Sequence, residues 1–176
     1  MMKKFSLLIM ALCVIMLIAV TGCMPTPPTP TPPTPTPTPT QTPGMEKNFT
    51  LLDLSGQSFT LSDHLGKPIV LCFFMSNCPA CKSEVPHLNS IHQKYADSEE
   101  LMVIGIGIRA GIAEFVQSQG VQYLVLQDDE DETVSDLYGV RSVPHNVFIN
   151  RQGRITRQIS RSLSESELEQ YINEIF

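Results

Sequence analysis

Two cysteines separated by two residues, Cys78 and Cys81, carry the strongest chemical signal in this sequence. Such a pair can exchange disulfides with other thiols, or it can supply half of a structural zinc site. A zinc site would need two further ligands at short spacing. The chain has no second cysteine pair of this kind, and His87 and His92 are five residues apart, on different faces of a helix. Disulfide exchange is therefore the favoured interpretation, and we expect no bound metal.

The sequence around the pair predicts where it lies. A continuous apolar run at 68–74 precedes it, as expected of a central strand covered on both faces, and a helical pattern runs from Pro79 to about Tyr95. Unpaired N–H groups and the dipole at a helix N-terminus stabilise an anion, so the Cys78 thiolate should form below the usual pKa of about 8.5. Cys78 is the predicted attacking sulfur. Cys81, one turn later, is the predicted resolving thiol.

The rest of the chain predicts an α/β fold. A hairpin is expected around the turn at 55–57, and Ser164 with Glu167 forms a capping box for the last helix. Strand and helix patterns alternate and then end in a hairpin and a helix, which favours a mixed central sheet flanked by helices. Strands are predicted at 49–54, 59–61, 68–74, 101–108, 123–126, 145–149 and 154–159, and helices at 79–95, 110–119, 134–138 and 164–175.

The N-terminus has the layout of a secretory signal. Two lysines precede an uncharged apolar run at 5–20, and small residues then lead to Cys23, as in the bacterial lipobox. That resemblance implies cleavage after Gly22 and a lipid on Cys23. An uncleaved signal anchor is the alternative, because an apolar run of this length can just span a bilayer. Both alternatives place the domain on the extracytoplasmic face of the bacterial cell membrane.

A segment rich in Thr-Pro repeats follows this signal, at 24–44. It cannot build a helix or a sheet ladder, and it lacks apolar side chains to bury. We expect a semi-rigid polyproline II spacer of about 60 Å, at about 3.1 Å per residue. The predicted organisation is a signal peptide at 1–22, a lipidated cysteine and linker at 23–44, and one domain at 45–176.

Charge and the remaining cysteine exclude other classes of protein. The formal net charge is −6, and about −8 without Lys3 and Lys4, whereas a nucleic-acid-binding protein needs a basic footprint. The acidic run at 128–132 is predicted to be a solvated loop rather than a metal site. Cys72 lies on the predicted buried strand, so we expect a small apolar core residue rather than a reactive thiol.

Three strings resemble the TlpA/ResA-like branch of the thioredoxin superfamily. They are Leu-Ser-Asp-His-Leu-Gly-Lys-Pro at 61–68, Cys-Pro-Ala-Cys-Lys-Ser-Glu-Val-Pro at 78–86 and Tyr-Gly-Val-Arg-Ser-Val-Pro at 138–144. The resemblance covers about residues 46–176. It implies a thioredoxin-like fold with an N-terminal β-hairpin. It also implies a membrane-anchored thiol-disulfide oxidoreductase whose redox group is the cysteine pair itself, without a cofactor.

The resemblance also assigns roles to residues outside the pair. Pro144 matches a cis-proline that faces the cysteines and exposes the backbone of Val143 for pairing with an extended substrate. Glu84 matches a buried acid near the resolving cysteine, and such an acid has a raised pKa and can exchange protons with a thiol. The expected substrate-binding residues are Asn77, Pro79, Val143 and His145.

Three positions near the pair differ from the usual family residues. Asn77 replaces a tryptophan, Ala80 stands where proline is common, and His145 replaces a more usual threonine. Pro79 occupies the first helical position, which leaves one N–H donor fewer for the Cys78 thiolate. These differences bear on redox potential and on the choice of partner. His145 either tunes Cys78 by its charge or only packs at the start of a strand.

The leading interpretation is an extracytoplasmic oxidoreductase acting on protein thiols and disulfides. By resemblance it is a reductase of the cytochrome c maturation type, which receives electrons from a membrane-bound donor. The same residues could instead act as a thiol oxidant if Cys78 had a very low pKa. An oxidant would pass its electrons to a membrane-bound acceptor. A thiol peroxidase is a second class, but its pattern has Pro at position 74 and Thr at position 78, unlike Phe74 and Cys78 here. A copper-delivery protein using Cys78, Cys81 and His145 is a third, although such relatives more often space their cysteines by three residues.

Overall fold

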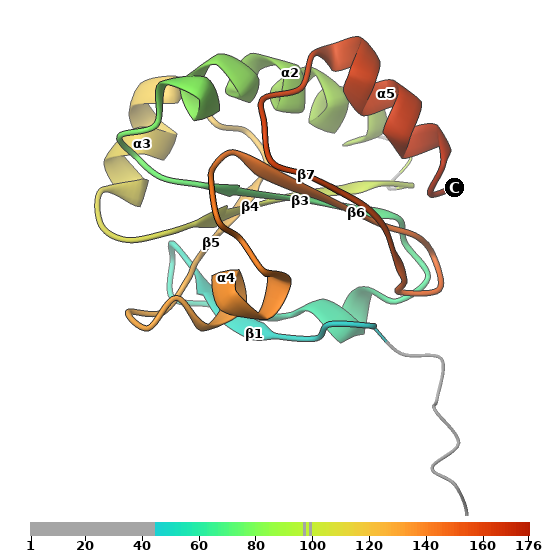
Figure 1. Ribbon diagram of the computed structural model, residues 1–176, viewed down its shortest axis with the longest axis horizontal. Helices are drawn as coiled ribbons and strands as arrows, with labels where there is room; N and C mark the ends of the chain where they lie inside the picture. Colours follow the sequence, from blue (N-terminus) through green and yellow to red (C-terminus); the bar gives the residue numbers. More distant parts are fainter. Residues whose placement is uncertain (1–44, 97, 99) are drawn as a thin grey trace, which may run out of the picture. The chain divides into compact units, whose positions relative to one another are not determined.

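The computed structural model describes residues 45–176, apart from residues 97 and 99. The predicted signal peptide, Cys23 and the Thr-Pro linker lie outside these residues. Within the described part, seven strands form one sheet in the order β2-β1-β5-β4-β3-β6-β7 (Figure 1). None of the helices described is long and apolar enough to cross a membrane.

Strand β3 (Ile69–Phe74) is an inner strand of the sheet, and each of its residues is buried. It pairs in parallel with β4 (Met102–Gly107) and antiparallel with β6 (His145–Ile149). A strand with neighbours on both edges and helices over both faces must carry apolar side chains throughout. This explains the continuous apolar run that precedes Cys78.

Hairpins complete the two edges of the sheet. Strands β1 (Thr50–Asp53) and β2 (Ser58–Thr60) form the predicted N-terminal hairpin, which pairs antiparallel with β5 (Leu124–Gln127). At the other edge, β6 pairs antiparallel with β7 (Ile155–Ile159). The pairs β3–β4 and β4–β5 are parallel and the other four pairs are antiparallel, so the prediction of a mixed sheet is confirmed.

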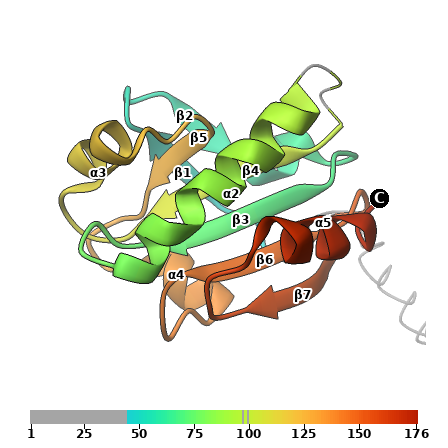
Figure 2. The same ribbon diagram turned by 90° about the horizontal axis from the view of Figure 1, so that it is seen from above.

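Helices cover both faces of the sheet. Figure 1 and Figure 2 show α2 (Pro79–Ala96), α3 (Ile112–Gln119) and α5 (Glu165–Asn173) on one face and α4 (Thr133–Tyr138) on the other. The capping box of α5 is present as predicted. A short 3-10 helix, η1 (Leu61–His64), was not predicted, because four residues are too few to show a helical period.

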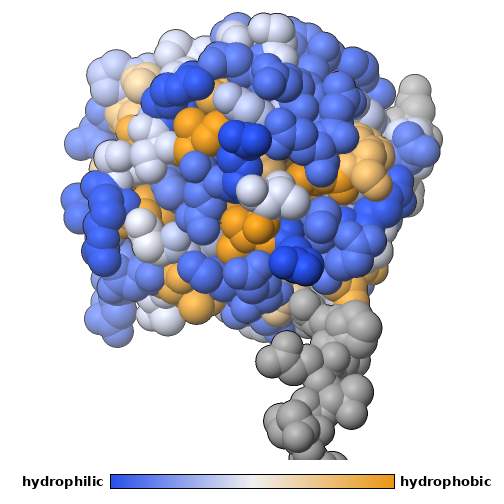
Figure 3. All heavy atoms as spheres, turned by 45° about the vertical axis from the view of Figure 1, so that its right-hand side comes forward, coloured by the Kyte–Doolittle hydropathy of each residue, from blue (hydrophilic) through white to orange (hydrophobic). Residues whose placement is uncertain are grey.

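Two hydrophobic clusters divide the core, one on each face of the sheet. Alternate residues of β3 contribute to them: Val70, Cys72 and Phe74 to the cluster that includes residues of α2 and α5, and Ile69, Leu71 and Phe73 to the other. Cys72 is therefore the core residue that was predicted, on the face that carries the cysteine pair. On the surface shown in Figure 3, hydrophilic residues dominate and apolar ones form small separate groups.

Candidate active site

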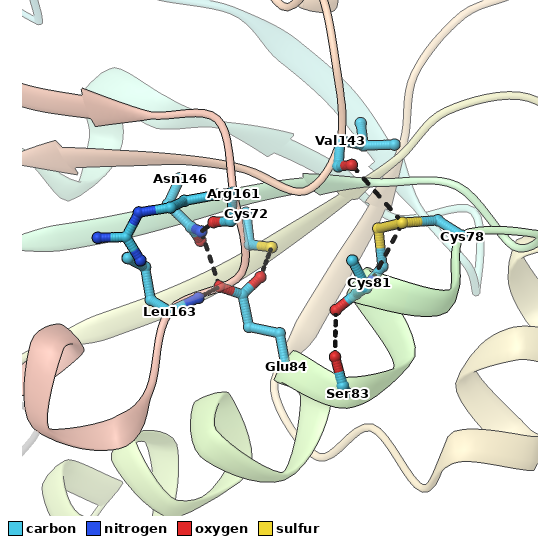
Figure 4. Close-up of a disulfide and its surroundings, with 10 residues drawn as sticks. Cys72, Cys78, Cys81, Ser83, Glu84, Val143, Asn146, Arg161 and Leu163 are labelled. Carbon is cyan, nitrogen blue, oxygen red and sulfur yellow. Dashed lines mark hydrogen bonds between the residues drawn. A yellow bond between two sulfur atoms is a disulfide. The ribbon is translucent and has the colours of Figure 1, made fainter.

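Cys78 and Cys81 form a disulfide at the start of α2, with their Cα atoms 5.2 Å apart (Figure 4). The helix begins at Pro79, as predicted, so Cys81 lies in its first turn. The backbone N–H of Cys81 points at Sγ of Cys78 over 3.1 Å. Once the disulfide is reduced, this donor and the helix dipole would stabilise a thiolate on Cys78.

The loop before β6 faces the pair. The peptide bond between Val143 and Pro144 is cis, as the resemblance implied. The carbonyl oxygen of Val143 lies 3.7 Å from Sγ of Cys78. Val143 is half-buried and Pro144 is buried. The backbone of the loop before β6 therefore lies directly beside the predicted attacking sulfur.

Glu84 is almost fully buried, at 1% exposure, one helical turn after Cys81. Its Oε1 accepts hydrogen bonds from the backbone N–H of Leu163 at 2.7 Å and from the side-chain amide of Asn146 at 2.8 Å. Its Oε2 accepts from the thiol of Cys72 at 3.5 Å. Burial raises the pKa of Glu84, and these donors act in the opposite direction. The site thus contains an acid that is buried and hydrogen-bonded, with a raised pKa.

The AhpC/TSA family model matches residues 45–158. The chain belongs to the AhpC/TSA family. It is 30% identical to the thiol-disulfide oxidoreductase ResA of Bacillus subtilis (strain 168), over 72% of this chain and 71% of ResA. ResA of Halalkalibacterium halodurans is 29% identical, over 71% of this chain and 72% of that protein.

Solved structures agree with this assignment. A secreted disulfide oxidoreductase of Mycobacterium tuberculosis, described as homologous to E. coli DsbE, is 28% identical with a TM-score of 0.64; the match covers 72% of this chain and 95% of that one. The fold is therefore thioredoxin-like. Together with the cysteine pair at disulfide distance, the relatives show that this AhpC/TSA member is a thiol-disulfide oxidoreductase of the TlpA/ResA-like kind.

The predicted substrate-binding residues fall into two groups. Asn77 and Pro79 are exposed on either side of Cys78, and Val143 lies across from it. His145 is 5% exposed, and its hydrogen bonds run elsewhere: Nδ1 pairs with Ser160 Oγ at 2.7 Å and Nε2 with Gln158 Oε1 at 3.0 Å. These contacts favour the packing alternative for His145.

Glu84 has partners that the sequence reasoning missed. Cys72 and Asn146 are opposite each other on β3 and β6, so the strand alternation points both side chains to the α2 face. A polar asparagine inside the otherwise apolar segment at 146–149 was a usable signal of a buried polar contact. The N–H of Leu163 left no such signal, since it comes from a loop far away in sequence.

One residue of the acidic run needs a correction. Residues 129–131 are exposed, as predicted of a solvated loop, but Asp128 is only 4% exposed. Its carboxylate accepts from the N–H groups of Val134 at 3.1 Å and Ser135 at 2.9 Å, and from the hydroxyl of Ser135 at 2.6 Å. These bonds satisfy donors at the start of α4 that would otherwise be unpaired. Among the described residues, no group of three or more His, Cys, Asp and Glu side chains is placed to hold a metal ion.

Proposed function

We propose that this protein is a lipid-anchored, extracytoplasmic reductase of protein disulfides, of the cytochrome c maturation type. The observation that carries the proposal is Glu84, a buried acid one turn behind a cysteine pair, in a chain similar to ResA. The pair itself carries the electrons, so the reaction requires no cofactor. A membrane-bound electron donor would return the pair to its dithiol form.

The reaction has two exchange steps. The Cys78 thiolate attacks one sulfur of a substrate disulfide, a mixed disulfide forms, and the other substrate sulfur leaves as a thiolate. Cys81 then attacks Sγ of Cys78, which restores the Cys78–Cys81 disulfide and releases the second substrate thiolate. The substrate gains the two electrons that the pair loses. The backbone of Val143, beside Cys78, would hold the substrate in an extended form.

Glu84 serves the second step. Cys81 must lose its proton before it attacks, and a buried carboxylate with a raised pKa is suited to accept it. Glu84 follows Cys81 by three residues on α2, so the two side chains share one side of the helix. When the pair is reduced again, the same group would return the proton to Cys81.

Reduction is favoured over oxidation by the surroundings of Cys78. A strongly oxidising pair needs a very stable thiolate. Here Pro79 supplies no N–H, and the hydrogen bonds of His145 are directed to β7 and the residue after it. Glu84, when ionised, adds a negative charge near the pair. Pro79 and His145 thus give no stabilisation to the Cys78 thiolate and an ionised Glu84 would oppose it, which supports a disulfide that is a weak oxidant.

Redox equilibration with glutathione tests the direction. We expect a potential below about −180 mV, in the range of reducing thioredoxin-like proteins. A clearly higher potential would show that the protein is an oxidant instead.

A trapping experiment tests the substrate class. Full-length Cys81→Ser protein, expressed with its anchor, cannot resolve the mixed disulfide and should accumulate proteins bound to Cys78. The matched control also carries Cys78→Ser. Adducts that are absent, or that persist in the control, would contradict exchange with protein disulfides.

The anchor is tested separately. The apolar leader, Cys23 and the Thr-Pro spacer support attachment to the outer face of the membrane by a lipid. Cys23→Ala should move the protein from the membrane fraction to the soluble fraction if cleavage still occurs. Retention of an uncleaved chain in wild-type cells would instead indicate a signal anchor.

A further inference from the structure

Cys72 is the free cysteine among the described residues, and the reaction proposed above leaves it unused. Its thiol donates to Oε2 of Glu84 over 3.5 Å, and Figure 4 shows the sulfur directed at the carboxyl group. We propose that Cys72 is a positioning residue: its S–H group holds Oε2 of Glu84 and sets how readily that carboxyl group gives up and takes back a proton. This inference rests on the proposed role of Glu84.

The two oxygens of Glu84 have different surroundings. Oε1 is held by the N–H of Leu163 and by the amide of Asn146. The second hydrogen of that amide is directed to the carbonyl oxygen of Arg161 at 3.2 Å, so Asn146 has no further donor to offer. Oε2 has Cys72 as its hydrogen-bond donor. Oε2 is therefore the oxygen that can take up a proton, and Cys72 is the group that competes with that proton.

Among the described residues, no other hydrogen-bond donor contacts Oε2 of Glu84. Within the part of the chain that the structure describes, Oδ1 of Asn146 is a buried side-chain acceptor without a hydrogen-bond partner. The cluster around Glu84 is thus short of donors rather than of acceptors. A donor removed at Cys72 leaves Oε2 uncompensated.

Cys72 keeps its proton, as this role requires. Its side chain is 2% exposed. Burial, and to a smaller extent the nearby carboxyl group of Glu84, raise the pKa of the Cys72 thiol well above its ordinary value. Cys72 is thus a donor rather than a nucleophile, which fits its place on a buried inner strand of the sheet.

Other ionisable groups face Glu84 from each neighbouring element. Arg161, before α5, lowers the pKa of Glu84 by its charge, but its side chain is half-exposed and is paired with Glu167 at 2.7 Å. Tyr123, before β5, has a pKa raised well above its ordinary value by burial, so it stays neutral. The cysteine pair at the start of α2 is oxidised and does not titrate. Cys72 is the ionisable side chain that contacts Oε2 directly.

The test measures the titration of Glu84 itself, in the oxidised full-length protein in detergent micelles. Carbon-13 NMR of labelled glutamate carboxyl groups gives the midpoint, and Glu84→Gln assigns the signal. Cys72→Ala should raise the midpoint by roughly half to one pH unit, the effect of one weak donor to a carboxylate. Cys72→Ser, which keeps a hydroxyl donor, should return it to the wild-type value or below.

Val70→Ala is the matched control, because it removes buried atoms from the same face of β3 but no hydrogen-bond donor. An unchanged midpoint in Cys72→Ala would overturn the inference, as would equal shifts in all three variants. If Cys72→Ala does not fold, a raised midpoint in Cys72→Ser overturns it equally. Reduction of insulin by the wild-type protein tests the proposed function independently. If insulin is not reduced but Cys72→Ala still shifts the titration midpoint of Glu84, the result counts against the proposed function and not against the role of Cys72.

Discussion

Replacing Glu84 by glutamine should slow the reaction while leaving the fold nearly intact. The glutamine oxygen can still accept from the N–H of Leu163 and the amide of Asn146, which wild-type Oε1 binds at 2.7 and 2.8 Å. Hydrogen bonds to a charged acceptor contribute about 1 kcal/mol more than neutral ones, so the two bonds weaken by about 2 kcal/mol. Burial outweighs these bonds in raising the pKa of Glu84, so removal of the buried charge offsets this loss. We expect a net change in stability of less than about 1 kcal/mol.

The effect on the rate should be much larger. Removing a positioned acid or base typically lowers a rate by about 100-fold or more. Because Glu84 is proposed to act when Cys81 attacks, the mixed disulfide on Cys78 should accumulate. Rapid acid quenching of a reaction with a disulfide-bonded peptide, followed by mass spectrometry, would detect this intermediate.

Glu84→Ala is the comparison that separates chemistry from stability. It leaves the two donors to Oε1 buried without an acceptor, at about 1–3 kcal/mol each, so urea unfolding should show a loss of about 2–6 kcal/mol. Both variants should be slow, but only the alanine variant should be strongly destabilised. A folded Glu84→Gln protein that resolves mixed disulfides at the wild-type rate would refute the proton-transfer role.

Three further predictions follow from burial and hydrogen bonding. Burial raises the folded-state pKa of Glu84 above its ordinary value of 4.5, so its contribution to stability is fully present below that pH and is lost as the pH rises through the raised value. The stability of the wild-type protein relative to Glu84→Gln should therefore fall in urea titrations as the pH rises above 4.5, and a rise would contradict the assigned direction. Asp128→Ala should destabilise the protein by about 2–4 kcal/mol by removing the acceptor for two buried N–H groups of α4, whereas exposed Glu130→Ala should change it by less than about 0.5 kcal/mol; equal losses would argue against the cap. In the reduced protein, iodoacetamide should modify Cys78 first and Cys72 only after unfolding, as mass spectrometry can show, and early labelling of Cys72 would contradict its burial.

Local sequence patterns were sufficient to predict most elements. The apolar run at 68–74 became β3, and the helix after it begins at the predicted Pro79. The box formed by Ser164 and Glu167 marked the start of α5. Each of these signals depends on neighbours within a few residues, where propensity, burial and capping act together.

Contacts between distant segments were harder to predict. Nothing in the hairpin at 50–60 indicates that β1 pairs with β5, because the pairing depends on which sheet edge remains open after folding. The burial of Asp128 was missed for a related reason. A run of acidic residues predicts exposure to solvent, and the sequence does not show that the Asp128 carboxylate accepts hydrogen bonds from residues of α4. The resemblance implied that Glu84 is buried, but its donors could be found only once β3, β6 and the loop before α5 were assembled around it.

The residues in which this chain differs from the family pattern lie outside the buried cluster behind the pair: Asn77 and Ala80 are exposed, and His145 packs toward β7. Asn77 is exposed beside Cys78, where it was predicted to bind substrate. Cys72 and Glu84 are buried behind the disulfide, where no substrate atom reaches. A substitution at Asn77 should thus alter which disulfides are attacked without changing the pH dependence of the reaction, because it leaves the donors to Glu84 in place. A change in the buried cluster should move the pH dependence for every substrate alike, so partner choice and proton transfer can vary independently in this fold.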